Sequence, residues 1–158
     1  MNILILSAST GGGHMRASKA IEGYMTQQNK DINVKIVDSL LYISPILNKT
    51  ITSGYVYLAT KTPKLYGKLY DLTNKEHRLA NFVTRLNNIF ANKLLPLIDD
   101  FRPDVIITTH PFPTEMVSRL KSKGEINIPL ICIMTDYAPH KAWINKKVDA
   151  YIVANDDM

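Results

Sequence analysis

Three consecutive glycines followed by a histidine stand where an apolar run gives way to a helical pattern, in the sequence SASTGGGHMRAS at residues 7–18. The apolar run at residues 3–6 is typical of a strand buried on both faces of a parallel sheet, and apolar residues recur at helical spacing over residues 17–25. Glycine accepts positive φ and lets a ligand approach the backbone, while unpaired N–H groups at a helix N-terminus attract negative charge. We therefore predict that Gly11, Gly12 and Gly13 bind substrate as a cradle for a phosphate or a sugar.

The histidine after the glycines is the first candidate for catalysis. His14 stands at the mouth of the loop, and an imidazole can take a proton from a hydroxyl group near neutral pH. Asp136 follows a later predicted strand and is the rival base, or the partner that orients a histidine. A structural role stays open for both residues, because a histidine can cap a helix and an aspartate can cap the turn that follows it.

Two commoner kinds of glycine loop fit less well. A Walker loop needs Gly-Lys followed by Ser or Thr, whereas His14 follows the last glycine here. The dinucleotide fingerprint fits in part, because Gly11 and Gly13 have the G-x-G spacing and Asp38 ends the next predicted strand, but Arg16 occupies the position of the third glycine. A nucleotide- or dinucleotide-binding Rossmann-type domain of an oxidoreductase is therefore the alternative.

The order of predicted elements indicates an α/β fold, namely a Rossmann-like parallel sheet with helices on both faces. The predicted strands lie at residues 3–6, 33–38, 105–109, 130–135 and 150–154. A long amphipathic helix is predicted over residues 76–101, with a kink or an end at Pro96, and the next helix starts near Pro113 and ends before Gly124. Ligands of open parallel sheets bind beyond the carboxyl ends of the strands, so we expect the candidate residues to gather along one edge.

The glycine loop is followed, in order, by TTHPFP at residues 108–113 and TDYAPHKAW at residues 135–143. With these three motifs the chain resembles the N-terminal domain of the monogalactosyldiacylglycerol synthase and processive diacylglycerol glucosyltransferase family over nearly its whole length. The resemblance implies the N-terminal half of a GT-B glycosyltransferase of the family 28 type, inverting and metal-independent. In such an enzyme the first domain holds the lipid acceptor and the second holds the UDP-sugar, and the resemblance places His14 at the reaction centre.

We therefore expect residues 1–158 to form an acceptor-binding N-terminal domain, without the nucleotide-sugar domain and inactive by itself. The expected reaction of the whole enzyme transfers a hexose from a UDP-sugar to diacylglycerol, a step of glycolipid biosynthesis. The expected partners are thus a diacylglycerol-type lipid acceptor and a UDP-sugar donor, the latter bound through the missing domain.

Four further residues near the later motifs are predicted to bind substrate. His110 precedes a rigid proline-containing turn that would fix its side chain toward the cleft, although a histidine satisfied by neighbouring backbone is the alternative. Tyr137, His140 and Trp143 are expected to shape the acceptor entrance, with packing as the alternative for the tryptophan. The histidines lack the paired spacing of a zinc site and Cys132 stands alone in an apolar run, so we expect neither metal nor cofactor.

Lysines and tyrosines alternate with apolar residues over residues 39–70, which contain no acidic residue. Aromatic rings with polar tips settle at the headgroup level of a bilayer, and lysines are attracted to an anionic leaflet. We predict that this segment binds an anionic membrane surface; an ordinary helical excursion packed on the domain is the alternative. The predicted membrane-binding residues are Lys49, Tyr55, Tyr57, Lys61, Lys64 and Lys68.

The composition agrees with a peripheral protein. Of the 158 residues 46% are hydrophobic and 21% charged, typical of one globular domain, and no apolar run approaches the roughly 20 residues of a membrane span. We expect a cytoplasmic protein, peripheral on the inner face of the cell membrane. The net charge of +5 fits an anionic surface. No nucleic-acid recognition motif accompanies that charge, so we expect no specific nucleic acid partner.

Overall fold

A computed structural model describes residues 1–9, 12–45, 89–136 and 141–155 of the chain. Five parallel strands form one sheet in the order β2-β1-β3-β4-β5. The strands are β1 (Asn2–Ser7), β2 (Asn33–Asp38), β3 (Val105–Thr108), β4 (Leu130–Ile133) and β5 (Ala150–Ile152). The helices that lie wholly within these ranges are α1 (Gly13–Gln28), α2 (Ser39–Ile43), α6 (Leu95–Phe101) and α7 (Pro111–Lys123), with a 3-10 helix η1 (Lys141–Trp143). The predicted α/β class, a Rossmann-like parallel sheet as in the N-terminal half of a GT-B enzyme, is confirmed.

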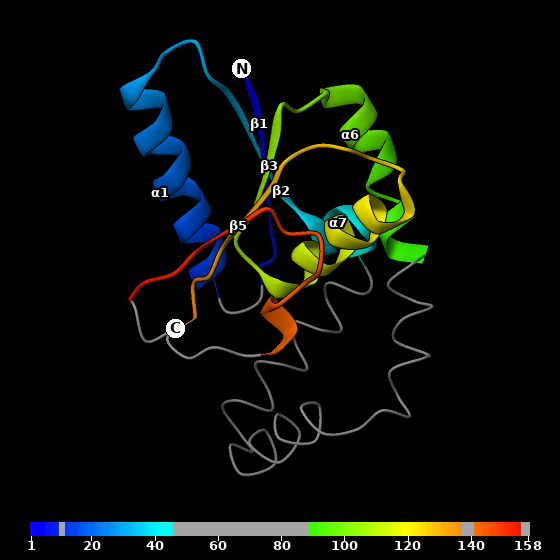
Figure 1. The fold of residues 1–158 in the computed structure, drawn as a ribbon. Helices are drawn as coiled ribbons and strands as arrows, with labels where there is room; N and C mark the ends of the chain where they lie inside the picture. The colour runs from blue at the N-terminus through cyan, green and yellow to red at the C-terminus, as the bar shows by residue number, and fades with distance from the viewer. Residues whose placement is uncertain (10–11, 46–88, 137–140, 156–158) are drawn as a thin grey trace.

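Helices lie on both faces of the sheet (Figure 1). Along β1 the buried side chains alternate: Leu4 and Leu6 pack in the core formed with α6 and α7, whereas Ile3 and Ile5 pack on the side of α1. Both sets are fully buried, which explains why the first strand is an uninterrupted apolar run rather than an alternating one.

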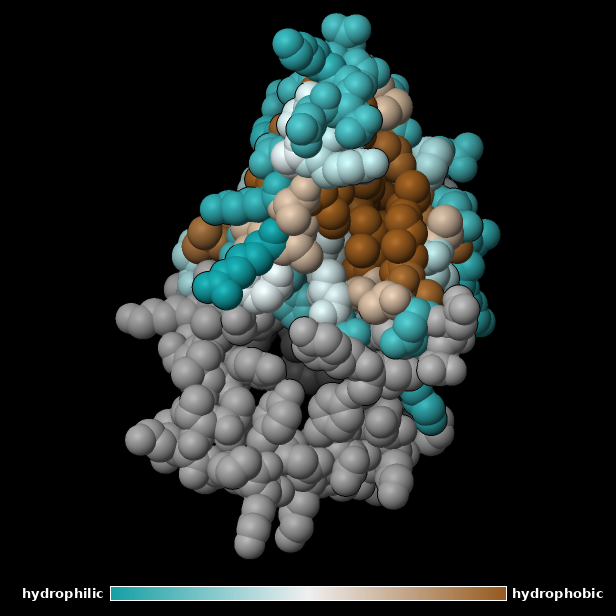
Figure 2. Space-filling view, turned by 90° about the vertical axis from the view of Figure 1, so that its left-hand side faces the viewer, coloured by the Kyte–Doolittle hydropathy of each residue, from teal (hydrophilic) through white to brown (hydrophobic). Residues whose placement is uncertain are grey.

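The layer on the α1 side is the thinner one. Among the helices that the structure describes, α1 alone packs there, against β1 and β2. Ile131 and Ile133 of β4 lie on the same face and are partly exposed, and Ile152 of β5 is 50% exposed. Figure 2 shows hydrophobic side chains open to view on this side of the molecule. The described residues therefore cover the two faces of the sheet unequally.

The helix boundaries follow the proline and glycine signals. Residues 89–92 are helical, the chain turns at Lys93, and α6 begins at Leu95 with Pro96 in its first turn. The predicted interruption at Pro96 is confirmed; the proline starts a new helix, where its missing N–H removes no helical hydrogen bond. α7 ends at Gly124, whose φ of 76° is left-handed, as predicted. No helix within the described ranges is long and apolar enough to cross a membrane.

The predicted site lies where the order in which the strands are added to the sheet reverses. β1 stands between β2 and β3, so the connection after β1 and the connection after β3 leave toward opposite sides, and open parallel sheets commonly bind their ligands at such a switch point. β3 ends one residue and β4 two residues before their predicted ends. Thr109 and Thr135 consequently lie just past the carboxyl ends of β3 and β4.

Candidate active site

The left-handed backbone of Gly12 sets the start of α1. Gly12 has φ 77° and ψ −16°, a conformation that strains any residue with a side chain, and it is the N-cap of the helix. A methyl group at Gly12 or Gly13 would meet no described atom within 4 Å. It is therefore the φ of Gly12, rather than crowding, that requires glycine there. Gly11 lies outside the described residues.

The His14 ring joins three loops that are far apart in the sequence. Its Nδ1 lies 2.9 Å from the Thr109 carbonyl oxygen and 2.6 Å from Thr135 Oγ1. The Thr135 hydroxyl in turn donates to the same Thr109 carbonyl at 3.1 Å. The loops after β1, β3 and β4 thus meet at one point, as the parallel topology predicts.

A buried chain of hydroxyl groups holds the first turn of α1 against the sheet. Ser7, Ser18 and Thr109 are all fully buried. Thr109 Oγ1 donates to Ser7 Oγ at 2.8 Å, Ser18 Oγ lies 2.9 Å from Thr109 Oγ1, and Ser18 Oγ donates to the His14 carbonyl at 3.1 Å. Thr109 therefore contacts His14 twice: its carbonyl oxygen lies beside the ring, and its hydroxyl oxygen lies 3.3 Å from the His14 carbonyl oxygen.

A second histidine stands edge-on to the first. The ring centroids of His14 and His110 are 4.5 Å apart, with an angle of 78° between the ring planes. His110 is the N-cap of α7, and its Nδ1 accepts the Phe112 N–H at 3.0 Å. Burial, with the nearby His14 as the smaller cause, lowers the pKa of His110 to about 3. His110 is therefore neutral at pH 7 and carries its proton on Nε2.

The indole of Trp143 also lies near the His14 ring. The indole is fully buried, its centroid lies 6.2 Å from that of His14, and its Nε1–H donates to Asp136 Oδ2 at 2.8 Å. Its carbonyl accepts from Asn145 Nδ2 at 3.2 Å and from the Tyr151 hydroxyl at 3.2 Å. Hydrogen bonds to its indole and to its carbonyl therefore fix the position of Trp143. Direct contact of Trp143 with an acceptor stays a prediction.

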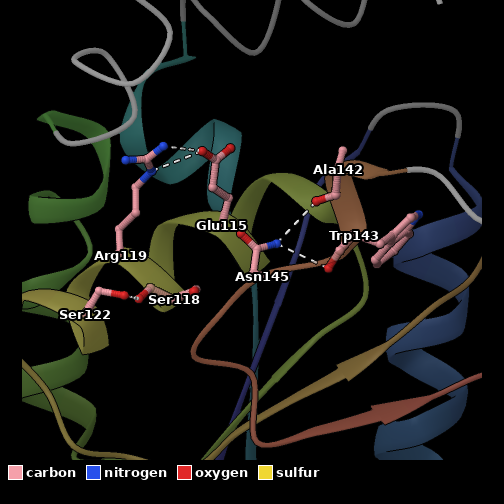
Figure 3. A network of polar contacts seen from close by, with 7 residues as sticks. All are labelled: Glu115, Ser118, Arg119, Ser122, Ala142, Trp143 and Asn145. Carbon is pink, nitrogen blue, oxygen red and sulfur yellow. Dashed lines mark hydrogen bonds and ion pairs between the residues drawn. The ribbon is translucent and has the colours of Figure 1, made fainter. Parts of the chain in front are cut away.

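The helix that His110 caps lies beside η1. Figure 3 shows the Trp143 indole pointing from η1 toward α1, with α7 on the other side. On α7, Arg119 pairs with Glu115 at 2.6 Å and Ser122 Oγ donates to the Ser118 carbonyl at 2.8 Å (Figure 3). These contacts stay within α7, so they stiffen the helix without touching His14.

The structure brings together four of the predicted site residues, namely His14, His110, Asp136 and Trp143. Gly12 and Gly13 stand directly before His14, at the start of α1. The remaining predicted residues lie outside the described ranges: Gly11, Tyr137, His140, Lys49, Tyr55, Tyr57, Lys61, Lys64 and Lys68. Within those ranges no three His, Cys, Asp or Glu side chains are grouped so that they could hold a metal ion.

The residues that hydrogen-bond to the His14 ring were not among the predicted site residues. Thr109 and Thr135 hold Nδ1, whereas Asp136 accepts from the indole. In the sequence, Thr109 and Thr135 each follow an apolar run that predicts a strand. This pattern does not indicate a contact with a histidine. Asp38, the acid of the alternative dinucleotide site, accepts the Leu41 N–H at 3.1 Å and caps α2.

Comparison with known proteins decides the family. A family model described as monogalactosyldiacylglycerol (MGDG) synthase matches residues 14–158. The chain belongs to the MGDG synthase family. It is also 34% identical, over 98% of its length, to proteins named processive diacylglycerol beta-glucosyltransferase from Bacillus thuringiensis (strain Al Hakam), Bacillus cereus (strain B4264) and Bacillus anthracis (strain A0248). The chain spans 39% of the length of these relatives. The resemblance to the MGDG synthase family inferred from the three motifs is confirmed.

Proposed function

We propose that this chain is the acceptor-binding part of a glycosyltransferase that moves a hexose from a UDP-sugar to diacylglycerol, with inversion. Membership of the MGDG synthase family and the names of the relatives support a diacylglycerol acceptor. The observation that carries the proposal is the position of His14, which follows the glycine loop beyond the carboxyl end of β1 and lies beside His110 and Trp143.

The donor is proposed to bind to a second domain outside these 158 residues, because the chain spans only 39% of the length of its relatives. The chain alone should then neither transfer sugar nor bind UDP-glucose or UDP-galactose. Isothermal titration calorimetry tests this division. Saturable binding of a UDP-sugar by the chain would contradict it, and tight binding of NAD would favour the dinucleotide alternative.

In the proposed reaction the acceptor hydroxyl of diacylglycerol attacks the anomeric carbon of the sugar. The bond between that carbon and the donor oxygen breaks, and its electron pair leaves with the diphosphate of UDP. The hydroxyl proton passes to His14, which acts as the general base. Asp136 remains the rival base, although in this structure one of its carboxylate oxygens accepts the Trp143 N–H.

The test of the proposed base is made in the full-length enzyme, in which this chain is joined to its donor domain. His14→Ala should lower turnover by about 100-fold or more, the usual scale of general-base catalysis, while the affinity for the donor stays the same. Asp136→Asn serves as the comparison. Near-normal turnover of His14→Ala together with a large loss in Asp136→Asn would transfer the role of base to the aspartate.

Membrane association belongs to the proposal as well. Diacylglycerol is water-insoluble, so an enzyme that uses it works at a bilayer surface, and the net charge of +5 suits an anionic one. We place the enzyme on the cytoplasmic face of the cell membrane, with residues 39–70 as the proposed contact.

A further inference from the structure

The two oxygens beside His14 Nδ1 decide which ring nitrogen carries the proton. A carbonyl oxygen can only accept a hydrogen bond, and the Thr109 carbonyl lies 2.9 Å from Nδ1. A deprotonated Nδ1 would set two lone pairs against each other at that distance. Nδ1 must therefore carry a hydrogen and donate it.

The Thr135 hydroxyl strengthens this assignment. A hydroxyl has one hydrogen, and in this structure Thr135 donates it to the Thr109 carbonyl at 3.1 Å. The lone pairs of Thr135 Oγ1 are then available to Nδ1, which lies 2.6 Å away. Both neighbours of Nδ1 are acceptors, and the ring N–H is shared between them.

We propose that Thr135, together with the Thr109 carbonyl, holds His14 in the tautomer with its proton on Nδ1, so that Nε2 is the nitrogen that receives the proton of the acceptor hydroxyl. The tautomer follows from the contacts alone, whereas the role of Nε2 rests on the proposed function. Thr135 is a positioning residue, because it acts through His14.

The partner histidine carries its proton on the opposite nitrogen. His110 Nδ1 accepts the Phe112 N–H and is therefore unprotonated, which leaves the hydrogen on Nε2. Because Nδ1 donates in His14 and accepts in His110, the two rings are expected to show opposite tautomers, although their centroids lie only 4.5 Å apart. His110 supplies an internal reference for an experiment that distinguishes the two forms.

The experiment is nitrogen NMR of the 158-residue chain labelled with 15N-histidine, at a pH where His14 is neutral. The chain contains four histidines, and the His14 signals are assigned by their loss in His14→Gln. We expect His14 to show a protonated Nδ1 and an unprotonated Nε2, and His110 to show the reverse pattern.

Two variants of Thr135 and one control variant test the role of Thr135 in holding the tautomer. Thr135→Val removes the hydroxyl and should lower the ratio of the Nδ1–H to the Nε2–H form of His14 about fivefold, the factor that corresponds to one net hydrogen bond. Thr135→Ser keeps the hydroxyl and should keep the ratio. Thr26→Val is the matched control, because the Thr26 hydroxyl bonds only to the backbone of α1, to the Glu22 and Gly23 carbonyls, and is similarly half-buried.

Kinetics of the full-length enzyme give the second measurement. Thr135→Val should lower kcat/KM in proportion to the fraction of His14 that remains in the Nδ1–H form, and so by at most about fivefold, and Thr135→Ser should restore it. If Thr135→Val does not fold, Thr135→Ala takes its place, and the tautomer of the wild-type chain still tests the assignment.

Failure of the inference and failure of the proposed function give different results. A wild-type His14 with its proton on Nε2 would overturn the inference, and an unchanged ratio in a folded Thr135→Val would remove Thr135 from it. Full activity of His14→Ala beside the expected tautomer would instead refute the proposed base and leave the assignment of the proton standing.

Discussion

Replacing Thr109 by valine removes one hydroxyl from the centre of the buried chain without changing the size of the side chain. The Thr109 hydroxyl lies 2.8 Å from Ser7 Oγ and 2.9 Å from Ser18 Oγ, and all three residues are fully buried. Valine leaves no cavity, so the cost comes from hydrogen bonds alone. Ser18 keeps its bond to the His14 carbonyl at 3.1 Å, whereas Ser7 loses the hydroxyl that donates to it.

The expected loss of unfolding free energy is about 1–2 kcal/mol. The lost hydrogen bond to Ser7 contributes about 1 kcal/mol net, and the buried Ser7 hydroxyl left without its donor adds up to about 1 kcal/mol more. For a chain of 158 residues this lowers Tm by about 2–8 °C, at about 2–4 °C per kcal/mol. The measurement is urea unfolding followed by circular dichroism, with a thermal scan alongside.

Thr26→Val is again the control, and it should change the free energy of unfolding by less than about 0.5 kcal/mol, as surface substitutions usually do. The carbonyl of residue 109 persists in Thr109→Val, so the His14 tautomer should be unaffected in the folded variant. A Thr109→Val chain as stable as the wild type would refute the energetic role given to the hydroxyl chain.

Three further predictions follow from the site and from the proposed membrane contact at residues 39–70. His110 is neutral in the folded chain, with a pKa of about 3, and takes up a proton near pH 6.5 when unfolded, so stability is lost as the pH falls from about 6.5 to about 3, by up to about 1.4 kcal/mol per pH unit. Urea unfolding between pH 7 and 4 should show this contribution to the slope in the wild type and not in His110→Asn, which keeps a capping oxygen. Asp136→Ala leaves the buried indole N–H of Trp143 without its acceptor and should cost about 1–3 kcal/mol, with a change in the emission of this sole tryptophan; Asp136→Asn should change both less. The chain should sediment with anionic vesicles at low salt, and a wild-type chain that stays in the supernatant would contradict the proposed membrane contact. Binding should weaken by up to about 4 kcal/mol when glutamine replaces four lysines, at about 1 kcal/mol each: Lys49, Lys61, Lys64 and Lys68.

The fold was predictable because its signals are local. β2 has the predicted bounds, Pro96 and Gly124 mark helix ends, and the apolar runs gave each strand to within two residues. The parallel topology then follows from the alternation of strands and helices, and it places the ends of β1, β3 and β4 together. The proximity of His14 and His110 could therefore be predicted from the sequence.

The contacts inside the site were not predictable to the same degree. Successive residues at a strand end point to opposite sides, so the sequence cannot say whether Thr135 or Asp136 turns toward His14. The carboxylate was favoured on chemical grounds, and the structure gives the contact to the threonine. The burial of Trp143 likewise depends on how η1 folds against α7 and β5, which no local pattern records.

Cys132 makes the equilibrium between the closed and the open form of this part of the sheet directly measurable. It is the single cysteine of the chain, and it is fully buried in β4, where it packs with Met134 and Trp143, three residues before Thr135. Burial also raises the pKa of the Cys132 thiol, so a thiol reagent reacts only after this part of the sheet has opened. The labelling rate divided by that of an unprotected thiol gives the equilibrium constant for the opening, in the absence of denaturant and without any change to the sequence.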